Sequence, residues 1–126
     1  MKNIRIILID DDETLCDGVA FILRDEGYSV MNTSDPIKGM ELVENHIFDI
    51  ALIDYKMPRL TGVEFLKRIK EKDPFTKVFI VSGKPFIENV LDEEKVSHLV
   101  EGIIKKPFKE ETLLDAVKGA VAEINK

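Results

Sequence analysis

Residues 4–12, with the sequence IRIILIDDD, form a short apolar run that ends in three aspartates. A second run of the same kind, DIALID at residues 49–54, also ends in an aspartate. Short isoleucine-rich runs bounded by polar residues are typical of strands that are buried on both faces of a parallel sheet. The carboxyl ends of parallel strands lie at one edge of the sheet, where open α/β sheets bind their ligands. The sequence therefore predicts a crevice that gathers Asp10, Asp11 and Asp54.

Carboxylates that lie so close together favour a bound cation. Two unit charges about 5 Å apart repel by roughly 3 kcal/mol at an effective dielectric constant of ~20. Oxygen ligands with room for water suit Mg²⁺, which usually works beside a phosphate group. We therefore predict a metal-assisted phosphoryl-transfer site at this edge of the sheet.

The composition is that of an ordinary single domain over residues 1–126, with 44% hydrophobic and 33% charged residues. No apolar stretch approaches the length of a membrane span, and the N-terminus lacks the layout of a signal peptide. A net charge of −6 argues against a basic surface that binds nucleic acid. The single cysteine, Cys16, cannot form an internal disulfide, which fits a reducing cytoplasm. We expect a cytoplasmic domain that binds neither nucleic acid nor membrane.

Runs typical of strands alternate with helical patterns along the chain. The expected strands span residues 4–9, 28–32, 49–54, 78–81 and 102–104. Gly27 would end the first helix, Asp35-Pro36 would begin the second, and Thr61 with Glu64 forms a capping-box pattern for the third. The pattern is weakest over residues 85–100, where a helix that starts near Ile87 fades. Five such βα units predict an α/β fold, a doubly wound parallel sheet with helices on both faces.

Side chains with useful chemistry follow four of these strands. Besides the aspartates, Ser82 comes after the fourth strand and Lys106 after the fifth. A carboxylate can attack a phosphoryl group and hold it as an acyl phosphate. The transfer needs positioning and neutralisation of charge more than covalent help. In this interpretation Lys106 neutralises part of the phosphoryl charge and Ser82 donates a hydrogen bond to it.

Four motifs in this order resemble the receiver domain of two-component response regulators. They are LIDDD at residues 8–12, IDYKMP at 53–58 with Gly62 following, VSG at 81–83, and KKPF at 105–108. The resemblance spans essentially the whole chain. It implies a flavodoxin-like fold, a (βα)5 three-layer sandwich whose five-stranded parallel sheet has the strand order 2-1-3-4-5.

The resemblance also implies the metal ligands and the acceptor. It makes Asp54 the phosphoacceptor and Asp11 a direct ligand of Mg²⁺. Asp10 would be a neighbour that acts largely through water. The backbone carbonyl of Lys56 would be a further ligand.

Partners and an output surface follow from the same resemblance. Ser82 takes the position of the switch hydroxyl, and Lys106 that of the lysine that contacts the phosphate. The phosphodonor would be a phosphohistidine on a sensor histidine kinase or phosphotransfer protein, and the domain would promote only its own phosphorylation and dephosphorylation. The fourth helix, fifth strand and fifth helix would pass the signal to a downstream effector. Ile103 stands where receivers often carry Tyr or Phe and has no ring to bury, which weakens the expected switch readout. The segment between Ser82 and Lys106 is atypical after Leu91, so we expect an unusual partner surface.

Two other functions fit parts of the same sequence. DDDET at residues 10–14 matches the Asp-x-Asp-x-Thr loop of haloacid-dehalogenase-like phosphatases, with Asp10 as nucleophile and Asp12 as acid–base. That interpretation leaves residues 54–58 without a role, and we expect Asp12 to be structural, as a helix N-cap or a solvated loop residue. A phosphorylation-independent protein-binding module is the second alternative, because Ile103 weakens the expected switch.

Overall fold

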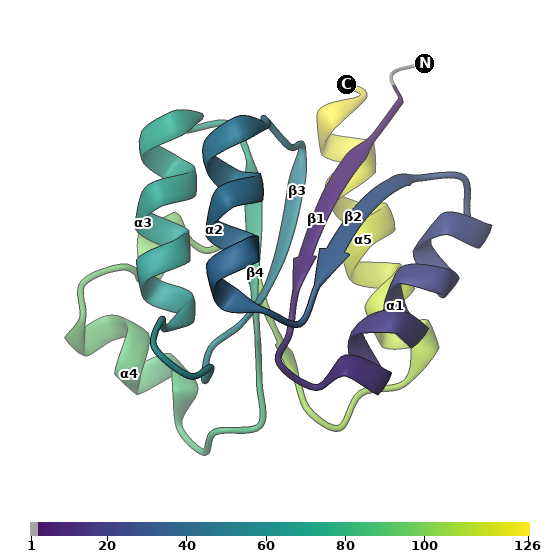
Figure 1. Ribbon diagram of the computed structural model, residues 1–126. Coiled ribbons are helices and arrows are strands. Elements are labelled where there is room, and N and C mark those ends of the chain that lie inside the picture. Colours follow the sequence, from purple (N-terminus) through teal and green to yellow (C-terminus); the bar gives the residue numbers. More distant parts are fainter. Residues whose placement is uncertain (1–2) are drawn as a thin grey trace.

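Five parallel strands form the central sheet of the computed structural model, which describes residues 3–126 (Figure 1). The sheet has the order β2-β1-β3-β4-β5, and its strands are β1 (Arg5–Ile9), β2 (Ser29–Thr33), β3 (Ile50–Asp54), β4 (Lys77–Ser82) and β5 (Gly102–Lys105). The expected fold class and strand order are confirmed, and each strand end lies within one residue of its predicted position.

Helices cover both faces of this sheet (Figure 1). They are α1 (Glu13–Asp25), α2 (Pro36–Asn45), α3 (Gly62–Lys72), α4 (Ile87–Glu93) and α5 (Glu110–Ile124), with a short 3₁₀ turn η1 (Ser97–Leu99). Buried residues of α1 and α5 pack on one face, and those of α2, α3 and α4 pack on the other. Within residues 3–126, no helix has both the length and the apolar character to span a membrane.

Each central strand contributes to both cores. Along β1, Ile7 and Ile9 join the core under α2 and α3, whereas Ile6 and Leu8 join the core under α1 and α5. All four side chains are at most 4% exposed. Burial on both faces explains why the strands are continuous apolar runs rather than alternating patterns.

Local capping interactions begin the first three helices as the sequence predicts. The Asp12 carboxylate accepts a hydrogen bond from the Leu15 amide at 3.1 Å, so of its two expected structural roles Asp12 takes that of the N-cap. Asp35 caps α2 before Pro36. Thr61 forms the reciprocal capping box of α3. These caps satisfy amide groups that have no partner inside the helix.

The segment between β4 and β5 is less regular. α4 has only seven residues, and its N-cap, Phe86, has a φ of 58°. Beyond its end Lys95 has a φ of 61°, and the chain then turns through η1 to reach β5. The helix that the sequence predicts from Ile87 is therefore present but short.

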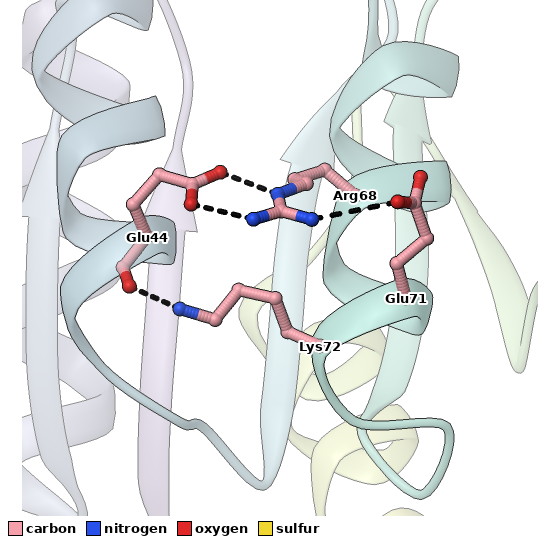
Figure 2. A network of polar contacts seen from close by, with 4 residues as sticks. All are labelled: Glu44, Arg68, Glu71 and Lys72. Atoms are coloured by element: carbon pink, nitrogen blue, oxygen red, sulfur yellow. Dashed lines mark hydrogen bonds and ion pairs between the residues drawn. The ribbon is translucent and has the colours of Figure 1, made fainter.

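A polar network joins the C-terminal halves of α2 and α3 (Figure 2). The Arg68 guanidinium donates to both carboxylate oxygens of Glu44, with 2.7 Å for one of these contacts, and lies 3.4 Å from Glu71. The Lys72 ammonium donates to the Glu44 carbonyl oxygen. Exposed ion pairs contribute little to stability, so the apolar contacts beneath hold these helices on the sheet.

Candidate functional site

The carboxyl ends of the strands bring the predicted side chains to one edge of the sheet. Asp10 follows β1, Asp54 ends β3, Ser82 ends β4 and Lys106 follows β5. Backbone hydrogen bonds continue beyond the strands and fix these positions: the Tyr55 amide donates to the Val81 carbonyl at 2.9 Å, and the Lys106 amide donates to the Ser82 carbonyl at 2.8 Å.

The expected acidic cluster is present. Asp10, Asp11 and Asp54 each offer a carboxylate oxygen, and these oxygens lie within 4.8 Å of one another. Asp10 and Asp54 are buried, whereas Asp11 is exposed. A donor set made of oxygen, with one member open to solvent, suits a hard cation that keeps several waters. The arrangement can therefore hold a metal ion.

Asp10 already has partners for both of its carboxylate oxygens. Oδ1 accepts a hydrogen bond from the Asp12 amide at 3.0 Å. Oδ2 lies 2.9 Å from the Lys106 Nζ. Direct coordination of a metal by Asp10 would compete with these contacts.

Lys106 bridges the two buried carboxylates. Its Nζ lies 2.9 Å from Asp10 Oδ2 and 3.3 Å from Asp54 Oδ2. Partial burial opposes protonation of Lys106, but the hydrogen bond to Asp10 and the charges of both aspartates raise its pKa. Lys106 therefore stays charged beside Asp54.

Burial and a neighbouring charge shift the acid–base behaviour of Asp54. Burial first, and then the negative charge of Asp10, raise the pKa of Asp54 to about 7, against the opposing effect of Lys106. A nearby positive charge favours the ionised form of a carboxyl group, so a cation bound beside Asp54 would lower its pKa again.

An open cavity of about 610 Å³ lies over Asp54. Asp54, Ser82 and Lys106 line it, together with Lys56 and Lys84. The Ser82 hydroxyl oxygen accepts a hydrogen bond from the Lys84 amide at 2.9 Å and keeps its own hydrogen as a donor. The cavity therefore presents a carboxylate, a hydroxyl donor and cations to a ligand that enters it.

The loop after β3 requires glycine at position 62, for a reason that the sequence motifs do not show. A Cβ on Gly62 would lie 2.8 Å from the Asp54 carbonyl oxygen and 2.9 Å from the Tyr55 Cα. The Gly62 amide donates to the Tyr55 carbonyl at 2.8 Å, so the loop closes back onto the end of the strand that carries Asp54. A glycine at the first position of a capped helix was the available signal.

An apolar recess beside Lys106 was also missed. It has a volume of about 320 Å³ and is lined by Leu15, Pro107 and Phe108 in addition to Lys106. Its residues come from the start of α1 and the loop before α5. The signal in the sequence was a proline and a phenylalanine directly after the lysine.

Comparisons with known proteins agree with this geometry. A model of the response regulator receiver domain family matches residues 6–118. Sporulation initiation phosphotransferase F of Bacillus subtilis is 26% identical over 118 residues, and the match covers 94% of this chain and 94% of that protein. The transcriptional regulatory protein DltR of Streptococcus agalactiae is 26% identical over 117 residues, covering 90% of this chain and 50% of DltR. This chain thus spans about half the length of DltR.

The fold is also found among solved structures. A response regulator receiver domain protein (CheY-like) from Methanospirillum hungatei JF-1 has a TM-score of 0.86 and 30% sequence identity, covering 97% of this chain and 96% of that one.

Proposed function

Because this chain belongs to the response regulator receiver domain family, we propose that it is a phosphoacceptor switch that takes a phosphoryl group onto Asp54. The observation that carries the proposal is the position of Asp54. Its carboxylate is buried at the end of β3, 3.3 Å from the Lys106 Nζ and within 4.8 Å of carboxylate oxygens of Asp10 and Asp11.

In the proposed reaction, a carboxylate oxygen of Asp54 attacks the phosphorus of a phosphohistidine. The phosphorus–nitrogen bond breaks, the imidazole leaves with the electron pair, and Asp54 becomes an acyl phosphate. The Lys106 ammonium and the Ser82 hydroxyl are placed to contact the phosphoryl oxygens, where charge builds up during the transfer.

The residues present fit Mg²⁺ as the metal of this site. Asp11 and Asp54 would bind it directly, Asp10 through water, and the Lys56 carbonyl would complete the protein ligands. When bound, the ion neutralises part of the charge on the phosphoryl group. Ionised Asp54 is the form that both binds a cation and attacks phosphorus.

The proposed donor is a sensor histidine kinase or a phosphotransfer protein. The apolar recess at Leu15, Pro107 and Phe108 borders Lys106 and offers a contact surface next to the acceptor. The proposed output surface is formed by α4, β5 and α5, which would bind a downstream effector. The net charge of −6 opposes direct contact of this domain with nucleic acid.

Phosphorylation with a small donor tests this function. The protein is treated with acetyl phosphate and Mg²⁺, and the modified residue is mapped by mass spectrometry. We expect modification of Asp54, loss of it in Asp54→Asn, and no loss in the matched control Asp12→Asn. Full phosphorylation in excess chelator would contradict the metal-dependent mechanism.

The same experiment separates the alternatives. A phosphatase turnover that survives Asp54→Asn but is removed by Asp10→Asn would favour the haloacid-dehalogenase-like reaction. Absence of any modification, with partner binding intact, would favour a phosphorylation-independent binding module.

A further inference from the structure

An apolar recess opens between α4 and β5, the last strand at one edge of the sheet. Leu91, Val100 and Ile103 line it, and its volume is about 280 Å³. Leu91 is buried, and the other two side chains are half-buried. A closed apolar cavity of roughly 150 Å³ already holds benzene. The recess therefore has room for one large apolar side chain from outside.

Short neighbouring elements leave this space open. α4 has only seven residues, and η1 covers the next stretch with a single turn. Gly102 begins β5 without a side chain, and a Cβ there would meet the ring of Phe79 at 3.2 Å, in the core on the opposite face of the sheet. The floor of the recess is therefore supplied by the branched side chain of Ile103, which packs against the core under α2 and α3.

The surroundings of the recess are strongly acidic. The segment from residue 87 to residue 101 contains one lysine and five acidic residues: Glu88, Asp92, Glu93, Glu94 and Glu101. Two of them, Glu88 and Asp92, stand at the recess itself. An acidic rim around an apolar floor favours a partner that brings positive charge together with an apolar anchor.

The groups that pair with the two rim carboxylates leave them accessible. Glu88 contacts Lys105 at 2.7 Å, but this ion pair is exposed on both sides, so a partner can replace it at small cost. Asp92 accepts a hydrogen bond from the Ser97 hydroxyl, which carries no charge. Both carboxylates therefore remain able to attract a basic group.

We propose that this recess receives one aromatic or leucine-sized side chain from a basic segment of the output partner. The proposal rests on the proposed function, because it gives the chemistry of the partner that the α4–β5–α5 surface binds. A buried apolar anchor supplies most of the affinity of such a contact, and the acidic rim steers the approach and sets the orientation.

The recess is also connected to the acceptor site. Ser82, which lines the cavity over Asp54, lies only five residues before the first residue of α4. A shift of Ser82 on contact with a phosphoryl group would therefore move the start of the segment that leads to α4. We expect the affinity of the recess to differ between the free protein and the protein loaded with beryllofluoride, a phosphoryl mimic.

A peptide titration tests the recess directly. The probe is the blocked peptide acetyl-KRFRK-amide, and its matched control is acetyl-KRARK-amide. Amide resonances of the ¹⁵N-labelled protein are followed at low salt. We expect saturable shifts at Leu91, Val100 and Ile103, and about tenfold weaker binding for the alanine peptide, as for loss of an interface anchor. Equal affinity for the two peptides would overturn the proposal, because charge alone would then explain binding.

Variants that fill the recess give a second test. Ile103→Phe and Val100→Met should each weaken binding of the phenylalanine peptide about tenfold, since the anchor loses its space. Ile37→Phe, at an exposed position on α2, is the control and should change nothing. Unchanged affinity in both filled variants, or no saturable shift with the wild-type protein, would overturn the proposal.

The contribution of the rim is measured separately. Asp92→Asn should weaken binding about threefold at low salt and have no effect at high salt, because the attraction is screened. Asp25→Asn on α1 is the matched control. A concentration-dependent dimer that Ile103→Phe abolishes would assign the recess to a second copy of the chain instead.

One further titration distinguishes a failure of the recess proposal from a failure of the proposed phosphoacceptor function. The peptide is also titrated into Asp54→Asn, which lacks the acceptor but keeps the recess. Peptide binding without any phosphorylation of the wild type would remove the proposed function alone. Phosphorylation of Asp54 without peptide binding would remove the recess proposal alone.

Discussion

Asp54 carries its charge at a site where burial opposes it. Three aspartates and one lysine meet at this edge of the sheet, so the fully ionised set has a net charge of −2. Lys106 is shared between Asp10 and Asp54 and can compensate only one of them. A divalent cation would neutralise this surplus negative charge, and the pKa of Asp54 is raised because burial and the charge of Asp10 both oppose its ionisation.

The first prediction concerns the stability of the metal-free protein. The pKa of an aspartate is about 3.9 in an unfolded chain, and that of Asp54 in the folded protein is about 7. Between these values the folded state binds more protons than the unfolded state, so the free energy of unfolding falls as pH rises. Urea unfolding in chelator should therefore show a loss of stability through this range.

The control for this effect is Asp54→Asn, which removes the titrating group and keeps the shape. It should flatten the decline and be more stable than the wild type at pH 8. Parallel pH profiles for the two proteins would show that Asp54 is not the group responsible.

The second prediction concerns the lifetime of the phosphoryl group. Lys56 and Lys84 both line the cavity over Asp54, where they can obstruct the water that attacks phosphorus or hold a phosphate oxygen. The double variant Lys56→Ala, Lys84→Ala should change the dephosphorylation rate by more than about threefold, or roughly 0.7 kcal/mol in the barrier. Either direction is compatible, because loss of bulk admits water and loss of charge loosens the phosphate.

Decay of the acyl phosphate, followed by mass spectrometry after donor removal, measures this rate. The matched control is Lys38→Ala, Lys67→Ala, at exposed positions on α2 and α3. Superimposable decay curves for wild type and the Lys56, Lys84 variant would show that these lysines do not act on hydrolysis.

At the scale of the elements, the sequence predicts those features that depend on contacts between residues close together in the chain. The caps at Asp12, Asp35 and Thr61 bond to amides two or three residues away, so the sequence alone could indicate them. The end of α4 could not be predicted in this way. Phe86 and Lys95 adopt positive φ although neither is glycine. Residues of these types rarely have this backbone conformation, so the sequence does not indicate it.

The third prediction tests the close approach at the start of α3. In Gly62→Ala the new Cβ would press against the backbone of Asp54 and Tyr55, which cannot yield as a flexible side chain does. We expect a loss of about 1–3 kcal/mol in the free energy of unfolding, as for overpacking. Phosphorylation should also slow, since the displaced loop carries the Lys56 carbonyl.

Gly119→Ala is the matched control, because it lies within α5 and a Cβ there has nothing within 4 Å. It should stabilise the protein by roughly 0.5–1 kcal/mol through helix propensity. Urea unfolding and acetyl phosphate labelling measure both variants. Equal behaviour of the two alanine variants would show that the loop can move away at no cost.

At the scale of the whole molecule, topology explains why the site was predictable. Parallel strands with helices on both faces must place their carboxyl ends together, so residues far apart in sequence meet without any further information. The partners of each side chain depend on packing instead. The contact between Lys106 and Asp10, and the recess between α4 and β5, arise from side-chain positions and element lengths that no motif encodes.

The last prediction joins metal binding to global stability. If Mg²⁺ binds the folded acidic site and has no comparable site in the unfolded chain, it must stabilise the fold by mass action. At a free concentration ten times its dissociation constant, the expected gain is about 1.4 kcal/mol. Urea unfolding with Mg²⁺, compared with sodium chloride at matched ionic strength, measures the gain. Asp11→Asn should abolish it while changing little without metal, because Asp11 is exposed. Equal stabilisation of Asp11→Asn and wild type would show that the metal binds elsewhere. Lys106 would then be the cation that compensates the charge of Asp10 and Asp54.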